Sequence, residues 1–232
     1  MSKSRLAKPP QTRIFGAPDQ PNVMPMPPAK ADRRTARTRA ALMQAFVDLL
    51  LAEGYDAVTV ERVAERANVG RSTFYVHYTG KEQILRQAMA RPMSMLAVLV
   101  GNELPPEALT HQMMHFQEQR RRNLVFFSAP VTAIRVKVLA ELIEPRLAVV
   151  ARQARARPIL ALPLIALQIA EAQSALINNW LAARPMPKPD IAAEALVAVT
   201  RATLTALLRC PPGASLLIPG EKLRFVHVGE DK

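Results

Sequence analysis

Apolar residues recur every three to four positions through most of the chain after residue 32, which is the spacing of one face of an α-helix. The first helix is predicted to end at Gly54, and its apolar stripe comprises Leu42, Phe46, Leu49 and Leu50. Thr59 is suited to cap a second, short helix, and a third is predicted over residues 71–76. Between these two lies Asn68-Val69-Gly70, where Asn and Gly tolerate the backbone angles of a tight turn. The pattern thus predicts one long helix followed by two short helices joined by a turn.

The helical period continues to about residue 209. Helices are predicted over residues 81–100, 105–122, 124–128, 131–155, 160–182 and 190–209, with a kink at Pro92, a disturbance at Pro145 and Asp190 as the cap of the last helix. Aromatic residues make up only 5% of the chain, whereas strong helix formers such as Ala, Leu and Arg are frequent. The predicted fold class is therefore all-α. Residues 223–228 alternate in polarity, which fits either a short strand or a flexible tail.

Charge is distributed unevenly along the chain. The formal net charge is +12, and the first 40 residues carry nine basic and two acidic side chains. Residues 1–31 are rich in proline and lack both the helical and the strand period, so they are expected to form a disordered basic arm. A basic balance of this size favours a polyanionic partner, either nucleic acid or an anionic membrane surface, and does not decide between them.

Several classes of protein do not fit this sequence. The only cysteine, Cys210, cannot form an intrachain disulfide and is interpreted as a small buried apolar residue. The longest apolar run, residues 159–170, contains Pro163 and is too short to cross a bilayer, and no signal-peptide core is present. No phosphate-binding glycine loop, nucleophile elbow or metal-ligand cluster has a recognisable spacing. We therefore expect a cytoplasmic protein that is not an enzyme and has no cofactor, no metal and no membrane partner.

Two short helices joined by a tight turn and packed on a longer helix form a helix-turn-helix, whose second short helix enters the major groove of DNA. The order and spacing of seven short motifs in residues 35–86 resemble the head of TetR-family transcriptional regulators. These motifs are Gly54-Tyr55, Thr59-Val60, Val63-Ala64, Ala67-Asn68-Val69, Ser72-Thr73-Phe74-Tyr75, His77-Tyr78 and Lys81-Glu82. The chain departs from the usual family residues at four positions, which are Asn68, Gly70, Ser72 and Gly80.

The resemblance implies a three-helix helix-turn-helix head over residues 32–86, a helical effector-binding and dimerisation domain over 87–210, and a tail over 211–232. It also implies three partners: double-stranded DNA, a small-molecule effector and a second copy of the chain.

DNA binding requires contacts that position the protein on phosphates and contacts that read base edges. Arg71 is the best candidate for reading a base, because a guanidinium can bind guanine through two hydrogen bonds. Thr59 suits a phosphate cradle, the resemblance implies backbone contacts by His77 and Lys81, and Phe74 is expected in the core. Basic residues at the start of the first helix either contact DNA or are solvated. The predicted DNA-binding residues are Thr59, Gly70, Arg71, Ser72, Thr73, Tyr75, His77, Lys81, Arg33 and Arg37.

Methionine and phenylalanine side chains are frequent in the middle helices and could line an adaptable apolar pocket for an effector. Each of them alone fits a core position equally well. His111 and His115 are four residues apart, so they could contact a ligand or form a weak metal site. The predicted effector-pocket residues are Met95, Leu99, Met113, His115, Phe116, Phe126 and Phe127.

The last two predicted helices each carry a stripe of small and large apolar residues. Such stripes fit either the core of one chain or, as the resemblance implies, a four-helix bundle formed with a second copy. The residues predicted for the dimer interface are Ile169, Gln173, Leu176, Ile177, Trp180, Val197 and Leu204.

The sequence therefore favours a repressor that binds a palindromic operator as a dimer and is released by a small apolar or amphipathic effector. The alternative keeps the same head in a nucleoid-associated or protein-partnered DNA-binding protein that has no small-molecule switch.

Overall fold

The computed structural model describes residues 30–104 and 106–218. Within these ranges the chain forms helices and no strand, which confirms the all-α prediction. The helices are α1 (Lys30–Glu53), α2 (Val60–Arg66), α3 (Arg71–His77), α4 (Lys81–Ala97), α5 (Pro106–Glu118), α6 (Arg120–Phe126), α7 (Ala129–Gln153), α8 (Leu162–Ala182) and α9 (Pro189–Leu208). The predicted arm, except for its last two residues, and the segment 223–228 lie outside the described residues.

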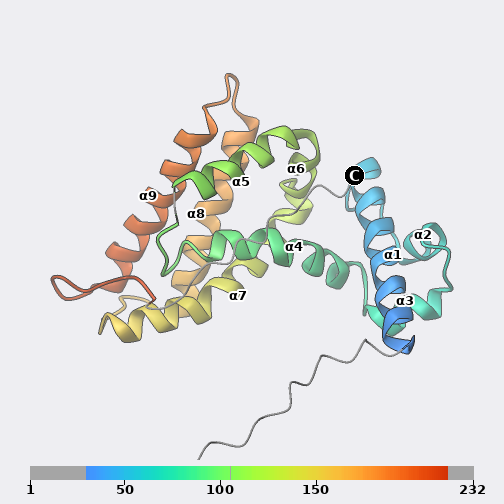
Figure 1. Cartoon of the computed structure of the whole chain (residues 1–232), viewed down its shortest axis with the longest axis horizontal. Coiled ribbons are helices and arrows are strands. Elements are labelled where there is room, and N and C mark those ends of the chain that lie inside the picture. The colour runs from blue at the N-terminus through green and yellow to red at the C-terminus, as the bar shows by residue number, and fades with distance from the viewer. Residues whose placement is uncertain (1–29, 105, 219–232) are drawn as a thin grey trace, which may run out of the picture.

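The molecule has a head and a body joined by one helix (Figure 1). Helices α1, α2 and α3 form the head, and α5 to α9 form the body. Helix α4 runs between them and contacts both α1 and α7. It is continuous through Pro92, with Ile84 and Leu85 buried toward the head end and Met93 and Leu96 buried toward the body end. Helix α4 is therefore a direct structural connection between the two parts.

The core of the head forms where the sequence pattern places it. The α1 residues Leu42, Phe46 and Leu50 are fully buried, as are Val63 of α2 and Phe74 of α3. Burying a large apolar side chain contributes about 1.5–3 kcal/mol, so these contacts dominate the stability of so small a unit. Phe74 is therefore a core residue, as predicted.

The predicted turn and cap of the helix-turn-helix are both present. Asn68 adopts a left-handed conformation with φ of 53°, so this asparagine serves in place of the more usual glycine. Thr59 is the N-cap of α2, and its Oγ1 accepts a hydrogen bond from the Arg62 backbone N–H at 3.3 Å. Two ion pairs, Arg62 to Glu53 and Arg66 to Asp48, connect α2 to α1. The position of α2 on α1 is thus fixed by charge as well as by apolar contact.

Several helix boundaries differ from the prediction by a few residues, and two of these differences have a local cause. The break between α5 and α6 lies at Gln119 rather than at Asn123, because the Asn123 side-chain amide donates to the Phe116 carbonyl at 3.0 Å and holds the new helix against the old one. Helix α9 begins at Pro189, and its N-cap is Lys188 rather than Asp190. Proline has no N–H to leave unpaired and its fixed φ suits the first helical position, which explains the earlier start.

In the body, α8 packs against both α7 and α9, and α5 packs against α9. After α9 the chain folds back, so that the Ile218 N–H donates to the Gly101 carbonyl at 2.6 Å. Gly101 has φ of +93°, and a Cβ atom there would lie 2.6 Å from the Ile218 side chain. Only glycine at position 101 allows the segment that follows α9 to approach the loop after α4 so closely.

Candidate DNA-binding face

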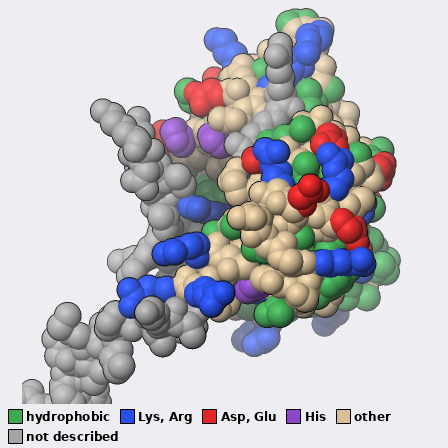
Figure 2. Space-filling view, turned by 90° about the vertical axis from the view of Figure 1, so that its right-hand side faces the viewer, with side chains coloured by type: hydrophobic (Ala, Val, Ile, Leu, Met, Phe, Trp, Pro, Cys, Tyr) green, Lys and Arg blue, Asp and Glu red, His purple; other side chains and the backbone are tan. Residues whose placement is uncertain are grey.

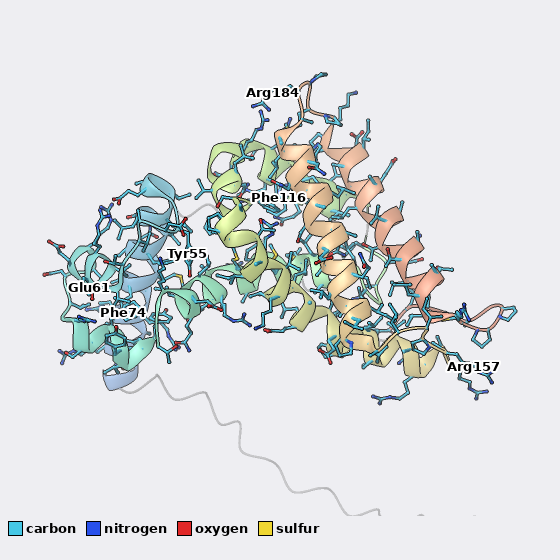
Figure 3. The ribbon with its side chains drawn as sticks, turned by 180° about the vertical axis from the view of Figure 1, so that it is seen from behind. Tyr55, Glu61, Phe74, Phe116, Arg157 and Arg184 are labelled. Carbon is cyan, nitrogen blue, oxygen red and sulfur yellow. The ribbon has the colours of Figure 1, made fainter. Side chains whose placement is uncertain are left out.

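Helix α3 presents one face to solvent and the other to the core. Arg71, Ser72, Tyr75 and Val76 are exposed, with Tyr75 at 48% and Val76 at 79% exposure, whereas Phe74 is completely buried. Figure 3 labels Glu61 on α2 and Phe74 on α3, both on the part of the head that lies away from the body. A short helix anchored by one aromatic residue and bearing polar side chains outward has the form needed to enter a DNA groove.

Arg71 already has two intramolecular partners on the exposed face. Its Nη1 lies 3.0 Å from Oε1 of Glu61, and its Cζ lies 5.7 Å from the centroid of the Tyr75 ring. The pKa of the Glu61 carboxyl is below its usual value because its own backbone N–H donates to it and Arg71 lies nearby. Glu61 therefore remains ionised and holds the guanidinium at the first turn of α3.

Lys81 has a role that the sequence did not predict. Its Nζ donates to the carbonyls of Tyr55 and Val58, at 3.1 Å each, and more weakly to that of Asp56 at 3.5 Å. The same ammonium lies 4.5 Å from the centroid of the Tyr55 ring. Because these contacts engage the donors of the ammonium, Lys81 holds the α1–α2 loop in place in the chain without DNA. The phosphate contact of Lys81 stays a prediction.

Basic side chains at the start of α1 lie next to the end of α3. Arg33, Arg37 and Arg39 are exposed, and the Cζ of Arg39 lies 5.8 Å from the centroid of the Tyr78 ring. Figure 2, which views the molecule from the side of the head, shows Lys and Arg side chains gathered at the lower left. The beginning of α1 therefore adds positive charge to the face formed by α3.

Of the remaining predicted DNA-binding residues, two are helix caps and two are half-buried. Gly70 is the N-cap of α3 and makes no side-chain cap hydrogen bond, so the first N–H groups of this helix are not covered by its own cap. Thr73 and His77 are half-buried at the edge of the exposed face. Thr59 caps α2 close to Glu61, and its Oγ1 accepts a hydrogen bond from the Arg62 backbone N–H, which leaves its O–H able to donate.

Comparison with known proteins agrees with this geometry. Residues 42–88 match the model of the family described as bacterial regulatory proteins, tetR family. The head of this chain is therefore similar to the head of TetR-family regulators. The uncharacterized HTH-type transcriptional regulator YxbF of Bacillus subtilis (strain 168) is 41% identical over 61 residues, which cover 26% of this chain and 16% of that protein. The HTH-type transcriptional regulator TcmR of Streptomyces glaucescens is 37% identical over 68 residues, which cover 28% of this chain and 30% of that protein.

The chain thus spans less than a third of the length of these two curated relatives, and the shared part is the head. Among solved structures, a TetR transcriptional regulator from Streptococcus agalactiae 2603V has 23% sequence identity and a TM-score of 0.51. That match covers 73% of this chain and 97% of the other. The likeness extends over head and body, so the TetR-type fold includes the helical C-terminal part.

In the body, most of the predicted effector-pocket residues form part of the apolar core. Leu99, Met113, Phe116 and Phe127 are buried, and the rings of Phe116 and Phe127 meet edge to face with centroids 6.5 Å apart. Met95 and Phe126 are partly buried. His115 is exposed, whereas Met113 on the same helix is buried, so His115 lies outside this apolar core and its place in a pocket stays a prediction.

Sequence reasoning missed Arg135, which is only 1% exposed. It lies on α7, and its guanidinium is beside the same aromatic cluster, with Cζ 3.8 Å from the centroid of the Phe127 ring. A signal was present, because Arg135 falls four residues after Val131 and four before Leu139, on the buried stripe of α7. A charged residue on an apolar stripe indicates a buried charge with a specific role.

The residues predicted for the dimer interface lie in or beside the core of the single chain. Five of them are buried within the single chain, because α8 packs between α7 and α9: Ile169, Gln173, Ile177, Trp180 and Leu204. Gln173 Nε2 donates to the Thr200 hydroxyl at 2.9 Å and to the Leu96 carbonyl at 3.4 Å, which joins three helices of one chain. Leu176 and Val197 are partly buried beside this core. Five of the seven residues therefore pack within one chain, and contact of Leu176 and Val197 with a second copy stays a prediction.

Proposed function

We propose that this protein is a dimeric DNA-binding transcriptional regulator. It would bind a palindromic operator, repress transcription there, and be released from the DNA by a small apolar or amphipathic effector. The observation that carries the proposal is the exposed first turn of α3, where Arg71 and Ser72 project beside Tyr75 while Phe74 fixes the helix to the head. In a major groove, Arg71 would read guanine, and Ser72 and Tyr75 would contact base edges or phosphates. The basic start of α1 would add attraction to the DNA backbone.

A second copy of the chain is proposed to cover the outer face of α8 and α9. The exposed apolar residues on this face are Leu164, Leu167, Ala175, Ile191, Ala198 and Ala202. Within the described residues, α9 is the one helix long and apolar enough to cross a membrane by length and composition, with a mean hydropathy of 1.6 and only 33% of that window buried. Since a head with this family's fold acts on DNA, a partner copy is the better explanation of an apolar helix that the chain itself leaves uncovered.

A twofold dimer places two α3 helices on one side of the DNA. Such a pair reads an inverted repeat whose half-sites are separated by the distance between the heads. An effector bound in the body would change that distance through α4, which contacts both parts. A coupling of about 1–3 kcal/mol is typical of such regulation, and operator DNA must weaken effector binding by the same factor. A protein of this kind acts in the cytoplasm.

The test is selection of binding sites from a random pool of duplex DNA by the purified full chain at fixed salt. We expect an inverted repeat to be enriched by the native protein and lost with Arg71→Ala. Arg201→Ala is the matched control, because Arg201 is an exposed arginine of α9 that pairs with Glu103 at 3.5 Å. Binding that follows salt concentration alone, with no enriched sequence, would overturn the proposal.

A further inference from the structure

Arg135 is a buried cation without an ionic partner. Its Nη1 donates to the carbonyl of Phe126 at 2.8 Å, and its Nε is buried without a hydrogen-bond partner. In the part of the chain that the structure describes, no carboxylate forms an ion pair with it, although five other arginines there do form such pairs. A guanidinium offers five N–H donors, and the Nε–H of this one is left without a partner inside the body.

An unpaired buried charge is unfavourable, and proteins normally pair such a group or place it at the surface. Burial lowers the pKa of Arg135 to about 10, which still leaves the side chain protonated near neutral pH. The fold therefore maintains a positive charge inside the body without neutralising it. This is the arrangement expected of a receptor for an anion that is supplied from outside the chain.

The surroundings of Arg135 are apolar and aromatic. The Phe127 ring lies 3.8 Å from Cζ of Arg135 and contacts Phe116 edge to face, and Met113 is completely buried in the same part of the body. Phe116 lies within the body on the side nearer the head, as Figure 3 shows. A ligand that fits both features has a compact apolar group and a single anionic group.

We propose that the effector of this protein is a small apolar carboxylate whose carboxylate binds Arg135. This inference rests on the proposed function, since it names the chemical class of the effector. The carboxylate would occupy the Nε side of the guanidinium, which has no protein partner, while the apolar group packs among Met113, Phe116 and Phe127.

The position of Arg135 also indicates how such a ligand would reach the head. The hydrogen bond to Phe126 joins α7 to the last residue of α6, and α6 in turn contacts α1. A carboxylate on the Nε side leaves the Nη1 hydrogen bond to Phe126 in place, so both groups would be held by one guanidinium. Binding would therefore fix the position of Arg135 and, through it, the contact of α6 with α7 next to the head.

The experiment measures thermal denaturation and heats of binding of the full chain without DNA. The probes are phenylacetate, cyclohexanecarboxylate and octanoate, each compared with its neutral amide. We expect at least one acid to raise Tm by about 2–4 °C more than its amide, and this acid-specific shift to be absent in Arg135→Met. Arg146→Met is the matched control, because Arg146 is on the same helix and donates to the Val100 carbonyl at 2.9 Å.

A native protein that none of the acids stabilises more than its amide overturns the inference, as does an unchanged acid-specific shift in Arg135→Met. Arg135→Lys keeps the charge and covers the case in which the Met variant does not fold. This variant should retain a smaller acid-specific shift in Tm. Equal Tm shifts with acid and amide in Arg135→Lys would count against the inference. Because DNA is absent, failure to select an operator would overturn the proposed function and leave carboxylate binding standing.

Discussion

Arg71 and Glu61 form an ion pair, with Nη1 and Oε1 3.0 Å apart, that joins the first turn of α3 to the first turn of α2. The two side chains are 62% and 55% exposed, and an ion pair so exposed is worth only about 0.2–1 kcal/mol. A guanine or a phosphate can therefore displace Glu61 from Arg71. The ion pair holds the guanidinium near its working position without preventing its use.

The first prediction follows from this pair. Glu61→Gln should strengthen operator binding by about two- to fivefold, because it releases Arg71 and removes a negative charge close to the DNA. Glu65→Gln on the same helix is the control for a change of charge alone. Fluorescence anisotropy with the selected operator would measure both. An equal gain in an Arg71→Ala background would contradict the role given to the ion pair.

Two neighbouring aromatic residues on α3, Phe74 and Tyr75, should have opposite effects when each is replaced by alanine: one on stability and the other on DNA binding. Phe74→Ala should destabilise the head by about 3–5 kcal/mol, because it leaves a cavity in a fully buried position. Tyr75→Ala should change stability by less than about 0.5 kcal/mol and weaken operator binding at least tenfold. Urea denaturation and anisotropy separate the two effects. Normal operator binding by Tyr75→Ala would place this side chain outside the DNA contact.

Lys81 provides a test that distinguishes a structural lysine from a phosphate contact. Lys81→Gln should lower Tm by about 2–4 °C, because the carbonyls of Tyr55 and Val58 lose their donor. The salt dependence of DNA binding should remain as in the native protein. Arg37→Gln should instead leave Tm unchanged and reduce the salt slope by about 1. A reduced salt slope in Lys81→Gln would support the phosphate role.

The proposed dimer face makes a prediction about assembly. Ala198→Glu introduces a charge on the exposed side of α9 and should convert a dimer to a folded monomer, as measured by light scattering and circular dichroism. Ala206→Glu places the same charge at another exposed position nearer the C-terminal end of α9, and its effect on the dimer would show how far the interface extends along the helix. A dimer that persists in Ala198→Glu would show that the copies meet elsewhere.

Arg135 has a consequence for stability as a function of pH. Burial lowers the pKa of Arg135 to about 10, below the ordinary value of an arginine, so the folded chain loses this proton before the unfolded chain does. Below about pH 10 the buried cation is destabilising, and the penalty is relieved as pH rises through this value. Arg135→Met should therefore raise the free energy of unfolding by about 1–3 kcal/mol near pH 8, by an amount that shrinks above about pH 10. A loss of stability in Arg135→Met near pH 8 would contradict this account.

The features that sequence predicts best are those set by neighbouring residues. Thr59 as a cap and Asn68 as the turn residue depend on local backbone geometry, and both were predicted. The role of Lys81 depends on carbonyls more than twenty residues away, which no local pattern reveals. The stripe that includes Gln173 shows that one side of α8 is covered, but periodicity cannot tell whether the covering helix belongs to the same chain. Arg135 was overlooked because a charged residue is ordinarily assigned to the surface.

Pro92 lies between the two halves of α4, after the residues that pack toward the head and before those that pack toward the body. Because proline has no N–H, the carbonyl of Ala88 lacks its usual donor and the helix bends more easily at this point than elsewhere. From Pro92 to the start of α4 the helix extends about 16 Å, so a bend of about 10° displaces the head by about 3 Å. That displacement equals the length of a hydrogen bond to a base. In the proposed dimer, the stiffness of α4 at Pro92 would govern how far a change in the body moves each head. A stiffer helix would transmit smaller changes, and a more flexible helix would make the distance between the two heads less well defined.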